Sequence, residues 1–553
     1  MTAPELRSCA EELLYLLGAN GVDVLFLNPG TDSAPVQEAA AGLSARGVPF
    51  PRLVPSSFES VALAAAHGYW QVTRRPQAVW VHVDAGTQNL GAMVHNVLRD
   101  RAGVVVLAGK TPYGEDPLEG GRDNPIHWQQ DVPDQAGIVR PYAKWTYELV
   151  RPADTARVVG RAVQVAGGGI PGLAYLTISR DVLMEPAGPP SLRRTGGWAR
   201  PSPPAAAPKV LARVVELLAG AERPLIVTTR LGRTPGASEA LARLAELAAI
   251  PVVGRPDAVN LPSGHPMACR DPGQAAELLS SADVVLVVEA DVPWLPSGAR
   301  PPDSATVVVI DPDPLRANMP LWTFASDIAV TADGGTALRQ LADALEAGGP
   351  GPDRGPAPVL RPPRAGGQVD EVLLALNDVL SPDDLVLDET VTNMDAVARL
   401  LDRRQPGTLL SSGAPGLGWS LGASVGVKLA APQRRVVTVV GDGSFMFGVP
   451  TSAFCLAAEA EAPFMAVVLN NNGYRASRMP VLELFPGGVS DRAGQVVGTR
   501  FRRPPSPADV ARACGGWGEA VDDLAGLRDV LAAGLKAVDA GSVAVVDVKI
   551  DQD

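Results

Sequence analysis

Residues 434–444 read RRVVTVVGDGS, and residues 464–473 read FMAVVLNNNG. In each stretch a short apolar run ends in a polar turn that contains glycine, which predicts a buried strand followed by a loop. In a parallel sheet such loops leave the carboxyl ends of the strands, where ligands bind. The glycine turns let the backbone approach an anion, and a helix that follows such a turn presents unpaired N–H groups.

Two residues of these loops carry hard oxygen atoms, since Asp442 has a carboxylate and Asn471 an amide. Mg²⁺ prefers oxygen ligands and usually takes one or two from the protein and the rest from phosphate and water. The pair therefore favours a magnesium-bound diphosphate. The alternative is that both are ordinary turns at strand ends. The occurrence of NN after the next strand, 26 residues after GDG, argues against that alternative.

Outside this region, two stretches rich in proline and glycine interrupt the chain at residues 185–208 and 348–367. Such stretches predict linkers, and they separate domains at 1–185, 205–348 and 368–553. Within each domain, short apolar runs alternate with helical stretches, which is typical of parallel sheets covered by helices on both faces. We therefore predict an α/β protein with three doubly wound domains.

Composition narrows the class of protein. The 553 residues are 46% hydrophobic and 20% charged, and the formal net charge is −12, which disfavours nucleic acid and anionic membranes as partners. The four cysteines are far apart, which argues against a disulfide framework or a zinc site and fits a reducing compartment. The N-terminal segment does not read as a signal peptide, and no apolar run is long enough for a membrane span. We expect a cytoplasmic protein.

The pair of motifs resembles the diphosphate motif of the thiamine-diphosphate (ThDP) dependent enzymes, which is GDG, a helix, a strand and then NN. The resemblance covers essentially the whole chain. It implies that the carboxylate of Asp442, the side chain of Asn471 and the backbone carbonyl of Gly473 ligate Mg²⁺. The remaining diphosphate contacts that it implies are Gly441, Gly443, Ser444 and Asn471. The interval between the two motifs is about two residues longer here than in many members of the family.

Two further loops resemble cofactor loops of this family. Residues 411–418, SSGAPGLG, are similar to the loop that bends ThDP. By this resemblance Leu417 would wedge between the two cofactor rings, and the Pro415 carbonyl would accept a hydrogen bond from the 4′-amino group. Upstream, residues 388–393, DETVTN, match a second diphosphate-contacting loop, in which Thr390 is the candidate contact.

The family also needs a glutamate opposite the aminopyrimidine ring of ThDP. Glu59 begins the stretch ESVALAAAHGYW, and Gly68 and Tyr69 follow it at the spacing found in the family. Glu59 would be the catalytic carboxylate, and a raised pKa would suit its proton exchange with the cofactor. The alternative is a helix-capping glutamate in a first turn.

Two branches of the family compete. Residues 28–31, NPGT, and the segment that starts at His82 are similar to benzoylformate decarboxylase, in which the matching positions supply a substrate-binding hydroxyl and an active-site histidine. We group Thr31 with the cofactor-binding residues and His82 with the catalytic ones. The segment WQQ, residues 128–130, resembles the acetolactate synthase loop that carries an active-site glutamine, and it adds Gln129 and His127 as catalytic candidates. A structural role for His82 and a surface position for His127 are the alternatives.

The resemblance implies an acetolactate synthase-like carboligase that acts on a 2-oxo acid or another activated carbonyl compound. The alternatives are a benzoylformate decarboxylase-like enzyme, ThDP-dependent cleavage of a diketone, and a non-catalytic subunit with this fold. ThDP and Mg²⁺ are the expected cofactors. FAD stays open, because acetolactate synthases often hold it and the sequence shows no clear additional FAD loops. We expect a homodimer or homotetramer with active sites at the subunit interface.

Overall fold

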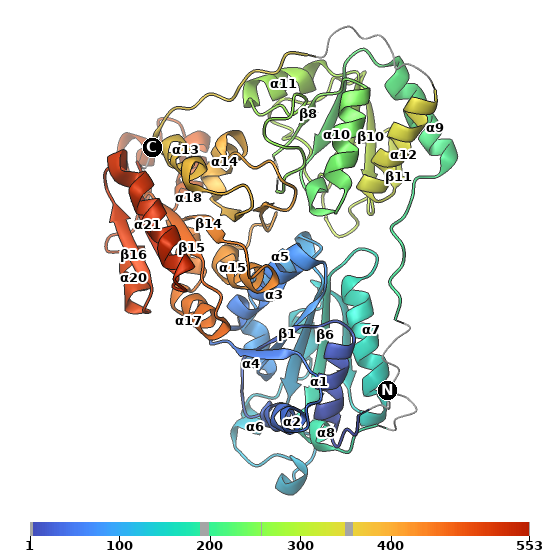
Figure 1. Cartoon of the computed structure of the whole chain (residues 1–553), viewed down its shortest axis with the longest axis vertical. Helices are drawn as coiled ribbons and strands as arrows, with labels where there is room; N and C mark the ends of the chain where they lie inside the picture. The colour runs from blue at the N-terminus through green and yellow to red at the C-terminus, as the bar shows by residue number, and fades with distance from the viewer. Residues whose placement is uncertain (1–3, 189–197, 256, 349–357, 552–553) are drawn as a thin grey trace. The chain divides into compact units, whose positions relative to one another are not determined.

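Parallel β-sheets organise the described part of this computed structural model, residues 4–188, 198–255, 257–348 and 358–551 (Figure 1). Within these residues there are three such sheets, one in each region predicted to be a domain. The predicted α/β class with parallel sheets is confirmed. Parts of both predicted linkers, residues 189–197 and 349–357, lie outside the described residues, so the domain boundaries stay predictions.

The first sheet is built from short apolar strands. In chain order they are β1 (Val24–Leu27), β2 (Arg52–Pro55), β3 (Gln77–Val81), β4 (Val104–Lys110), β5 (Ala143–Leu149) and β6 (Leu173–Ser179). Their order in the sheet is β2-β1-β3-β4-β6-β5, and the neighbouring strands run parallel. The chain therefore leaves β1 for one edge through β2 and then returns to the other side of β1 through β3. The gap between β1 and β3 is the switch point at which such sheets bind ligands.

Helices cover both faces of the first sheet. One face packs against α1 (Cys9–Ala19), α2 (Ala34–Ala45), α7 (Thr155–Gly167) and α8 (Arg180–Met184) in a single buried cluster. On the other side lie α3 (Glu59–Thr73), which contacts β1 and β3, α4 (Val83–Asn89), which contacts β4, and α5 (Met93–Arg99). Because both faces are buried, the inner strands β1, β3, β4 and β6 are apolar without alternation, as the sequence predicts. The edge strands β2 and β5 are partly exposed.

The second sheet has the same switch in strand order. Its strands are β7 (Pro224–Thr228), β8 (Val252–Val253), β9 (Val284–Val288), β10 (Thr306–Asp311) and β11 (Ile328–Thr331), arranged β11-β10-β9-β7-β8. The helices of this region are α9 (Pro208–Gly220), α10 (Ala237–Leu247), α11 (Pro272–Ser281) and α12 (Gly334–Ala347). Leu286 and Val288 point into one buried cluster, whereas Val285 and Val287 point into another. Successive side chains of a strand point to opposite faces, so this sheet is also covered on both sides.

The third sheet contains the two motifs that open the sequence. Its strands are β12 (Leu385–Glu389), β13 (Leu409–Leu410), β14 (Val436–Gly441), β15 (Met465–Asn470), β16 (Trp517–Val521) and β17 (Ala544–Lys549), arranged β13-β12-β14-β15-β17-β16. The helices are α13 (Gln368–Val379), α14 (Met394–Leu400), α15 (Trp419–Ala430), α16 (Asp442–Phe447), α17 (Pro450–Ala460), α18 (Arg475–Leu484), α19 (Val489–Arg492), α20 (Pro507–Ala513) and α21 (Leu527–Asp539). The sequence predicts two of the strands at the apolar runs of residues 435–440 and 464–469, and β14 and β15 start and end within one residue of them.

The chain divides into two compact units. One comprises the described parts of residues 1–201, 412–521 and 533–552, and the other comprises those of 202–411 and 522–532. In the first unit α3 packs closely on α15. A Cβ atom at Gly426 of α15 would lie 1.8 Å from the Ala65 carbonyl oxygen of α3, and one at Gly68 would lie 2.2 Å from the Ala423 carbonyl oxygen. Only glycine permits this approach of the two backbones. Among the described residues, no helix has the length and apolarity needed to cross a membrane.

Candidate active site

A buried carboxylate lies where β14 ends and α16 begins. Asp442 is the first residue of α16 and is 6% exposed. One of its carboxylate oxygens accepts a hydrogen bond from the backbone N–H of Gly443 and the other from that of Gly473, each at 2.9 Å. Burial raises the pKa of Asp442 to about 6, because the charged form loses its water. A cation beside this carboxylate would favour the charged form again.

The loop after β15 is held against the same carboxylate. The side-chain oxygen of Asn471 accepts a hydrogen bond from the Gly473 N–H at 3.2 Å. A Cβ atom at Gly473 would lie 2.2 Å from the Thr499 carbonyl oxygen, so this position requires glycine. The next residue, Tyr474, donates its N–H to the same carbonyl at 2.7 Å. The structure thus brings the three predicted metal ligands together and fixes their loop with a segment that the sequence did not indicate.

These donors fit Mg²⁺ with a diphosphate better than a metal held by protein alone. Across the described residues, no group of three or more His, Cys, Asp or Glu side chains is placed to hold a metal ion. Asp442 supplies a carboxylate, Asn471 an amide oxygen and Gly473 a backbone carbonyl. Mg²⁺ sites of this kind complete their octahedron with phosphate oxygens and water. A Cβ atom at Gly441 would meet nothing within 4 Å, so the backbone leaves open space beside the start of α16.

The predicted cofactor-bending loop precedes α15 and is clamped by the first domain. Asn96 of α5 donates to the Gly416 carbonyl oxygen at 2.8 Å and accepts from the Gly416 N–H at 3.0 Å. Gly418, at the end of the loop, has φ +90°, and a Cβ atom there would lie 2.4 Å from the backbone of Phe447. The backbone is therefore held at Gly416, between Pro415 and Leu417, and at Gly418, directly after Leu417. No sequence pattern marks Asn96.

Thr390 follows β12 in the second unit and is held by an acidic side chain. Its backbone N–H and its hydroxyl both donate to one oxygen of Asp388, at 2.9 and 2.8 Å. Burial raises the pKa of Asp388 to about 6. The next residue, Val391, has φ +52°, a strained value for a β-branched residue that occurs mostly at functional sites. The diphosphate contact of Thr390 stays a prediction.

Glu59 begins α3, as the sequence predicts, and is half-buried. Its carboxylate accepts a hydrogen bond from the Asn89 side chain at 3.2 Å, and a Cβ atom at Gly86 would lie 3.0 Å from it. Asn89 and Gly86 belong to α4, which starts directly after His82. Glu59 therefore faces the segment that carries His82, rather than capping its own helix with a side-chain hydrogen bond.

His82 follows β3 at the switch point of the first sheet. Val83, the first residue of α4, has φ +35°, so the chain turns sharply just after the histidine. The His82 Nδ1 atom forms a hydrogen-bonded ion pair with Asp32, and 24% of its side chain is exposed. The hydrogen bond to Asp32 raises the pKa of His82, against the opposing effect of burial. This histidine is therefore biased toward its protonated form and keeps an open side.

His127 lies at the same edge of the sheet, in α6 (Ile126–Gln129), and is 2% exposed. Its Nε2 atom lies 3.3 Å from the Thr31 hydroxyl, in the loop after β1. Burial lowers the pKa of His127, which favours its neutral form. His127 is thus not a surface histidine, and Thr31, His82 and His127 are brought together by the loops after β1, β3 and β4.

The two neighbouring glutamines of this segment differ. Gln129, the predicted residue, is exposed. Gln130, which follows it, contributes to the raised pKa of His82 and was not predicted. Asp32 is the other residue that sequence reasoning missed, although it directly follows Thr31.

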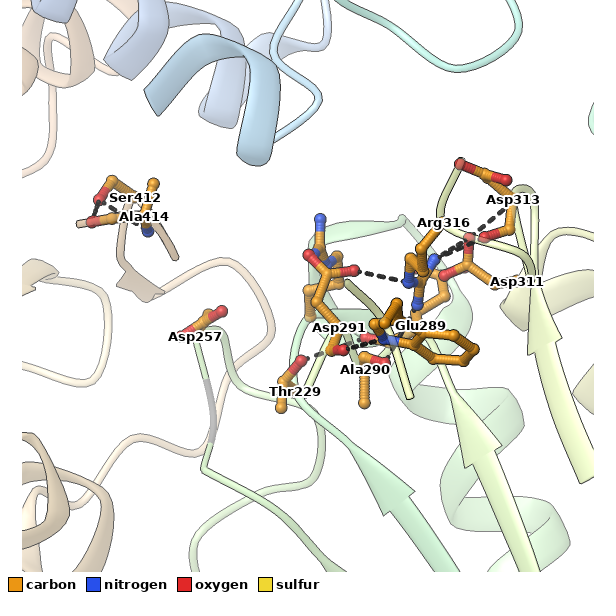
Figure 2. Close-up of polar contacts among 12 residues, drawn as sticks. Thr229, Asp257, Glu289, Ala290, Asp291, Asp311, Asp313, Arg316, Ser412 and Ala414 are labelled. Carbon is orange, nitrogen blue, oxygen red and sulfur yellow. Dashed lines mark hydrogen bonds and ion pairs between the residues drawn. The ribbon is translucent and has the colours of Figure 1, made fainter. Parts of the chain in front are cut away.

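The switch point of the second sheet carries an ion-pair network (Figure 2). Arg316 is 1% exposed and pairs with Asp311 at 2.6 Å and with Asp291 at 3.0 Å. Arg230 also pairs with Asp291. These charges at the carboxyl edge of β9 and β10 neutralise one another.

Three family models match along the chain. The N-terminal TPP binding domain of thiamine pyrophosphate enzymes matches residues 7–138, the central domain matches 211–341, and the C-terminal TPP binding domain matches 390–548. The chain belongs to the thiamine-diphosphate-dependent enzyme family. The predicted resemblance is therefore confirmed, with its N-terminal, central and C-terminal domains in the expected order.

Relatives of this ThDP enzyme include decarboxylases and synthases. The chain is 28% identical over 487 residues to a benzoylformate decarboxylase of Pseudomonas aeruginosa, with 84% of this chain and 86% of the relative covered. It is 26% identical over 499 residues to an acetolactate synthase large subunit of Parasynechococcus marenigrum, with 85% and 77% covered. The solved structure of a 4-hydroxybenzoylformate decarboxylase of Rhodococcus jostii has a TM-score of 0.80 at 23% identity, covers 99% of both chains and shows the shared fold.

Proposed function

We propose that this ThDP enzyme decarboxylates a 2-oxo acid without oxidation and releases the aldehyde. The observation that carries the proposal is the pair of histidines at the edge of the first sheet. The pKa of His82 is raised and that of His127 is lowered. Titratable groups whose pKa values are displaced in opposite directions within one site are suited to act as acid and base. A decarboxylation of this kind needs a proton delivered where CO₂ has left.

The loops after β14 and β15 support the assignment of the metal and diphosphate residues, and the family resemblance supports the rest. Asp442, Asn471 and Gly473 would hold Mg²⁺, and the start of α16 would face the diphosphate. Leu417 and Pro415 would support the ring system, and Glu59 would exchange a proton with the pyrimidine ring. When bound, ThDP supplies the electron sink that a 2-oxo acid needs in order to lose CO₂.

The chain's own residues then handle the substrate and its protons. His82 in its protonated form would pair with the substrate carboxylate and, once CO₂ has left, donate a proton to the carbon that becomes the aldehyde carbon. His127, neutral and bonded to Thr31, would orient the carbonyl oxygen of the substrate. Both roles need a histidine in the stated protonation state, which the surroundings of each ring favour.

Carboligation is the second candidate, and the position of Gln130 favours it. In the acetolactate synthase branch a glutamine of this loop belongs to the active site. The resemblance matches that residue to Gln129, and the next residue, Gln130, contributes to the raised pKa of His82. A site that binds a second carbonyl compound before the proton is delivered would give an acyloin. We also propose a homodimer or homotetramer in which two chains complete each active site, in keeping with the family.

Product analysis in heavy water tests the proposal. The protein, loaded with ThDP and Mg²⁺, is incubated in D₂O with 2-oxo acids from pyruvate to benzoylformate, with and without aldehyde acceptors, and products are followed by mass spectrometry. Aldehyde that carries one deuterium on its carbonyl carbon is expected, and His82→Gln should slow its release. His265→Gln is the matched control, because this histidine of the second domain pairs with Glu246. Acyloin as the main product would favour carboligation, and no turnover of any acid would contradict both candidates.

A further inference from the structure

Asp32 is the acidic partner of His82, and nothing in the activity proposed above assigns it a role. It directly follows Thr31, lies just before α2 and is 3% exposed. One of its carboxylate oxygens pairs with His82 Nδ1. The other accepts a hydrogen bond from the indole N–H of Trp80 in β3 at 3.2 Å. A buried carboxylate with both oxygens engaged in this way has a fixed orientation.

The surrounding backbone leaves room for this pair only because two positions are glycine. A Cβ atom at Gly30 would lie 2.0 Å from His82 Nδ1 and 2.6 Å from the Asp32 carboxylate. A Cβ atom at Gly109, in β4, would lie 1.7 Å from the other Asp32 oxygen. Real Cβ contacts are never so short, so any side chain at either position would displace the pair. Three strand ends, those of β1, β3 and β4, thus converge on Asp32.

We propose that Asp32 is a positioning residue for His82, which it holds with the proton on Nδ1 so that Nε2 exchanges protons with the substrate. This inference rests on the catalytic role proposed for His82, and it names the residue that sets the tautomer and orientation on which that role depends. A carboxylate on one ring nitrogen of a histidine fixes the tautomer and the ring orientation, and it stabilises the charged ring. Val83 has φ +35°, so the chain turns just after His82.

Several groups besides Asp32 face this histidine. Glu59 on α3 and the Gln130 side chain both contribute to the raised pKa of His82, after the hydrogen bond to Asp32 and against burial. The Asp32 charge also reaches His127, where it opposes the lowering of the pKa by burial. Loss of the Asp32 charge should therefore lower the pKa of both rings, with the larger change at His82, which it contacts directly.

The test is an NMR titration that does not require turnover. The holoprotein is labelled with ¹³C-histidine, its five histidines are titrated, and His82→Gln assigns the signal. In Asp32→Asn the pKa of His82 should fall by about 1 to 3 pH units, the effect of an opposite charge at contact distance. Asp84→Asn is the matched control, because this carboxylate lies two residues from His82 but accepts from Gln88. An unchanged pKa of His82 in Asp32→Asn would overturn the proposal.

A second variant covers the case in which Asp32→Asn does not fold. Gly109→Ala keeps both titrating groups but pushes a methyl group into the Asp32 carboxylate, and it should lower the pKa of His82 in the same direction. In kinetics, the alkaline limb of the kcat/KM profile should move to lower pH in both variants. If the pKa of His82 responds as expected but wild-type protein turns over no 2-oxo acid, the positioning role stands and the proposed decarboxylation fails. If the wild type turns over a 2-oxo acid but Asp32→Asn has the same pH profile of kcat/KM, the positioning role is refuted and the proposed decarboxylation stands.

Discussion

Replacing Asp442 by asparagine should weaken cofactor binding by an amount that the structure lets us estimate. Both carboxylate oxygens accept a backbone N–H, from Gly443 and from Gly473, at 2.9 Å. Asparagine keeps one acceptor oxygen but removes the negative charge that would lie beside Mg²⁺. A polar interaction with a charged group contributes about 1.5–3 kcal/mol, which corresponds to about 10- to 150-fold in an equilibrium constant. The Kd for ThDP in the presence of Mg²⁺ should therefore rise at least about tenfold.

Isothermal titration of ThDP at fixed Mg²⁺ measures this Kd, and a thermal melt checks that the variant is folded. Asp509→Asn is the matched control, since this aspartate is exposed on α20 of the same domain and pairs with Arg512. A folded Asp442→Asn variant that binds ThDP within twofold of the wild type would refute the assignment of Asp442 to the metal site.

Three further predictions concern protons, packing and subunits. The pH profile of kcat/KM should be bell-shaped, falling below the lowered pKa of His127, where that ring gains a proton, and above the raised pKa of His82, where that ring loses one. Gly426→Ala should lower thermal stability by about 1–3 kcal/mol, because its Cβ atom would meet the α3 backbone, as a melting curve would show. Co-expressed Glu59→Gln and Asp442→Asn chains should together show about a quarter of the wild-type activity at limiting ThDP, well above either variant alone, if two chains complete one site.

Each of these has its own control and contrary outcome. Gly220→Ala is the control for the packing variant, since a Cβ atom there would meet nothing within 4 Å, and equal melting temperatures for both variants would contradict the close helix contact. A kcat/KM profile that falls neither on the acid side nor on the alkaline side of pH about 6.5 would remove the two histidines from the rate-limiting protonation. If the co-expressed chains form oligomers but do not regain activity, each active site would lie within one chain.

The parts of the fold that could be predicted from the sequence are those that depend on residues close together in the chain. Strands β14 and β15 are continuous apolar runs that end in glycine turns, and both signals lie within a few residues. The metal-site group could be predicted for the same reason, because parallel strands bring the loops at their carboxyl ends to one edge. Glu59 was predictable because it opens a helix of small residues that ends at Gly68 and Tyr69.

The residues that were missed act over long sequence separations. Asn96 clamps a loop that lies 320 residues further along the chain, and no local pattern marks it. Asp32 matters because β1, β3 and β4 meet around it, which only the strand order reveals. Gln129 ends α6 and Gln130 is its C-cap residue, and the local sequence does not show which of the two side chains lies near His82.

The most direct test of the account is CO₂ release from 2-oxo acids by the protein loaded with ThDP and Mg²⁺, measured beside the Glu59→Gln variant loaded in the same way. Glu38→Gln, an exposed glutamate of α2, is the control. The account predicts that wild type and control release CO₂ from at least one acid only when ThDP is present, while Glu59→Gln still binds ThDP but is at least about 100-fold slower. Undiminished CO₂ release by Glu59→Gln, or no binding of ThDP to the wild type, would contradict it.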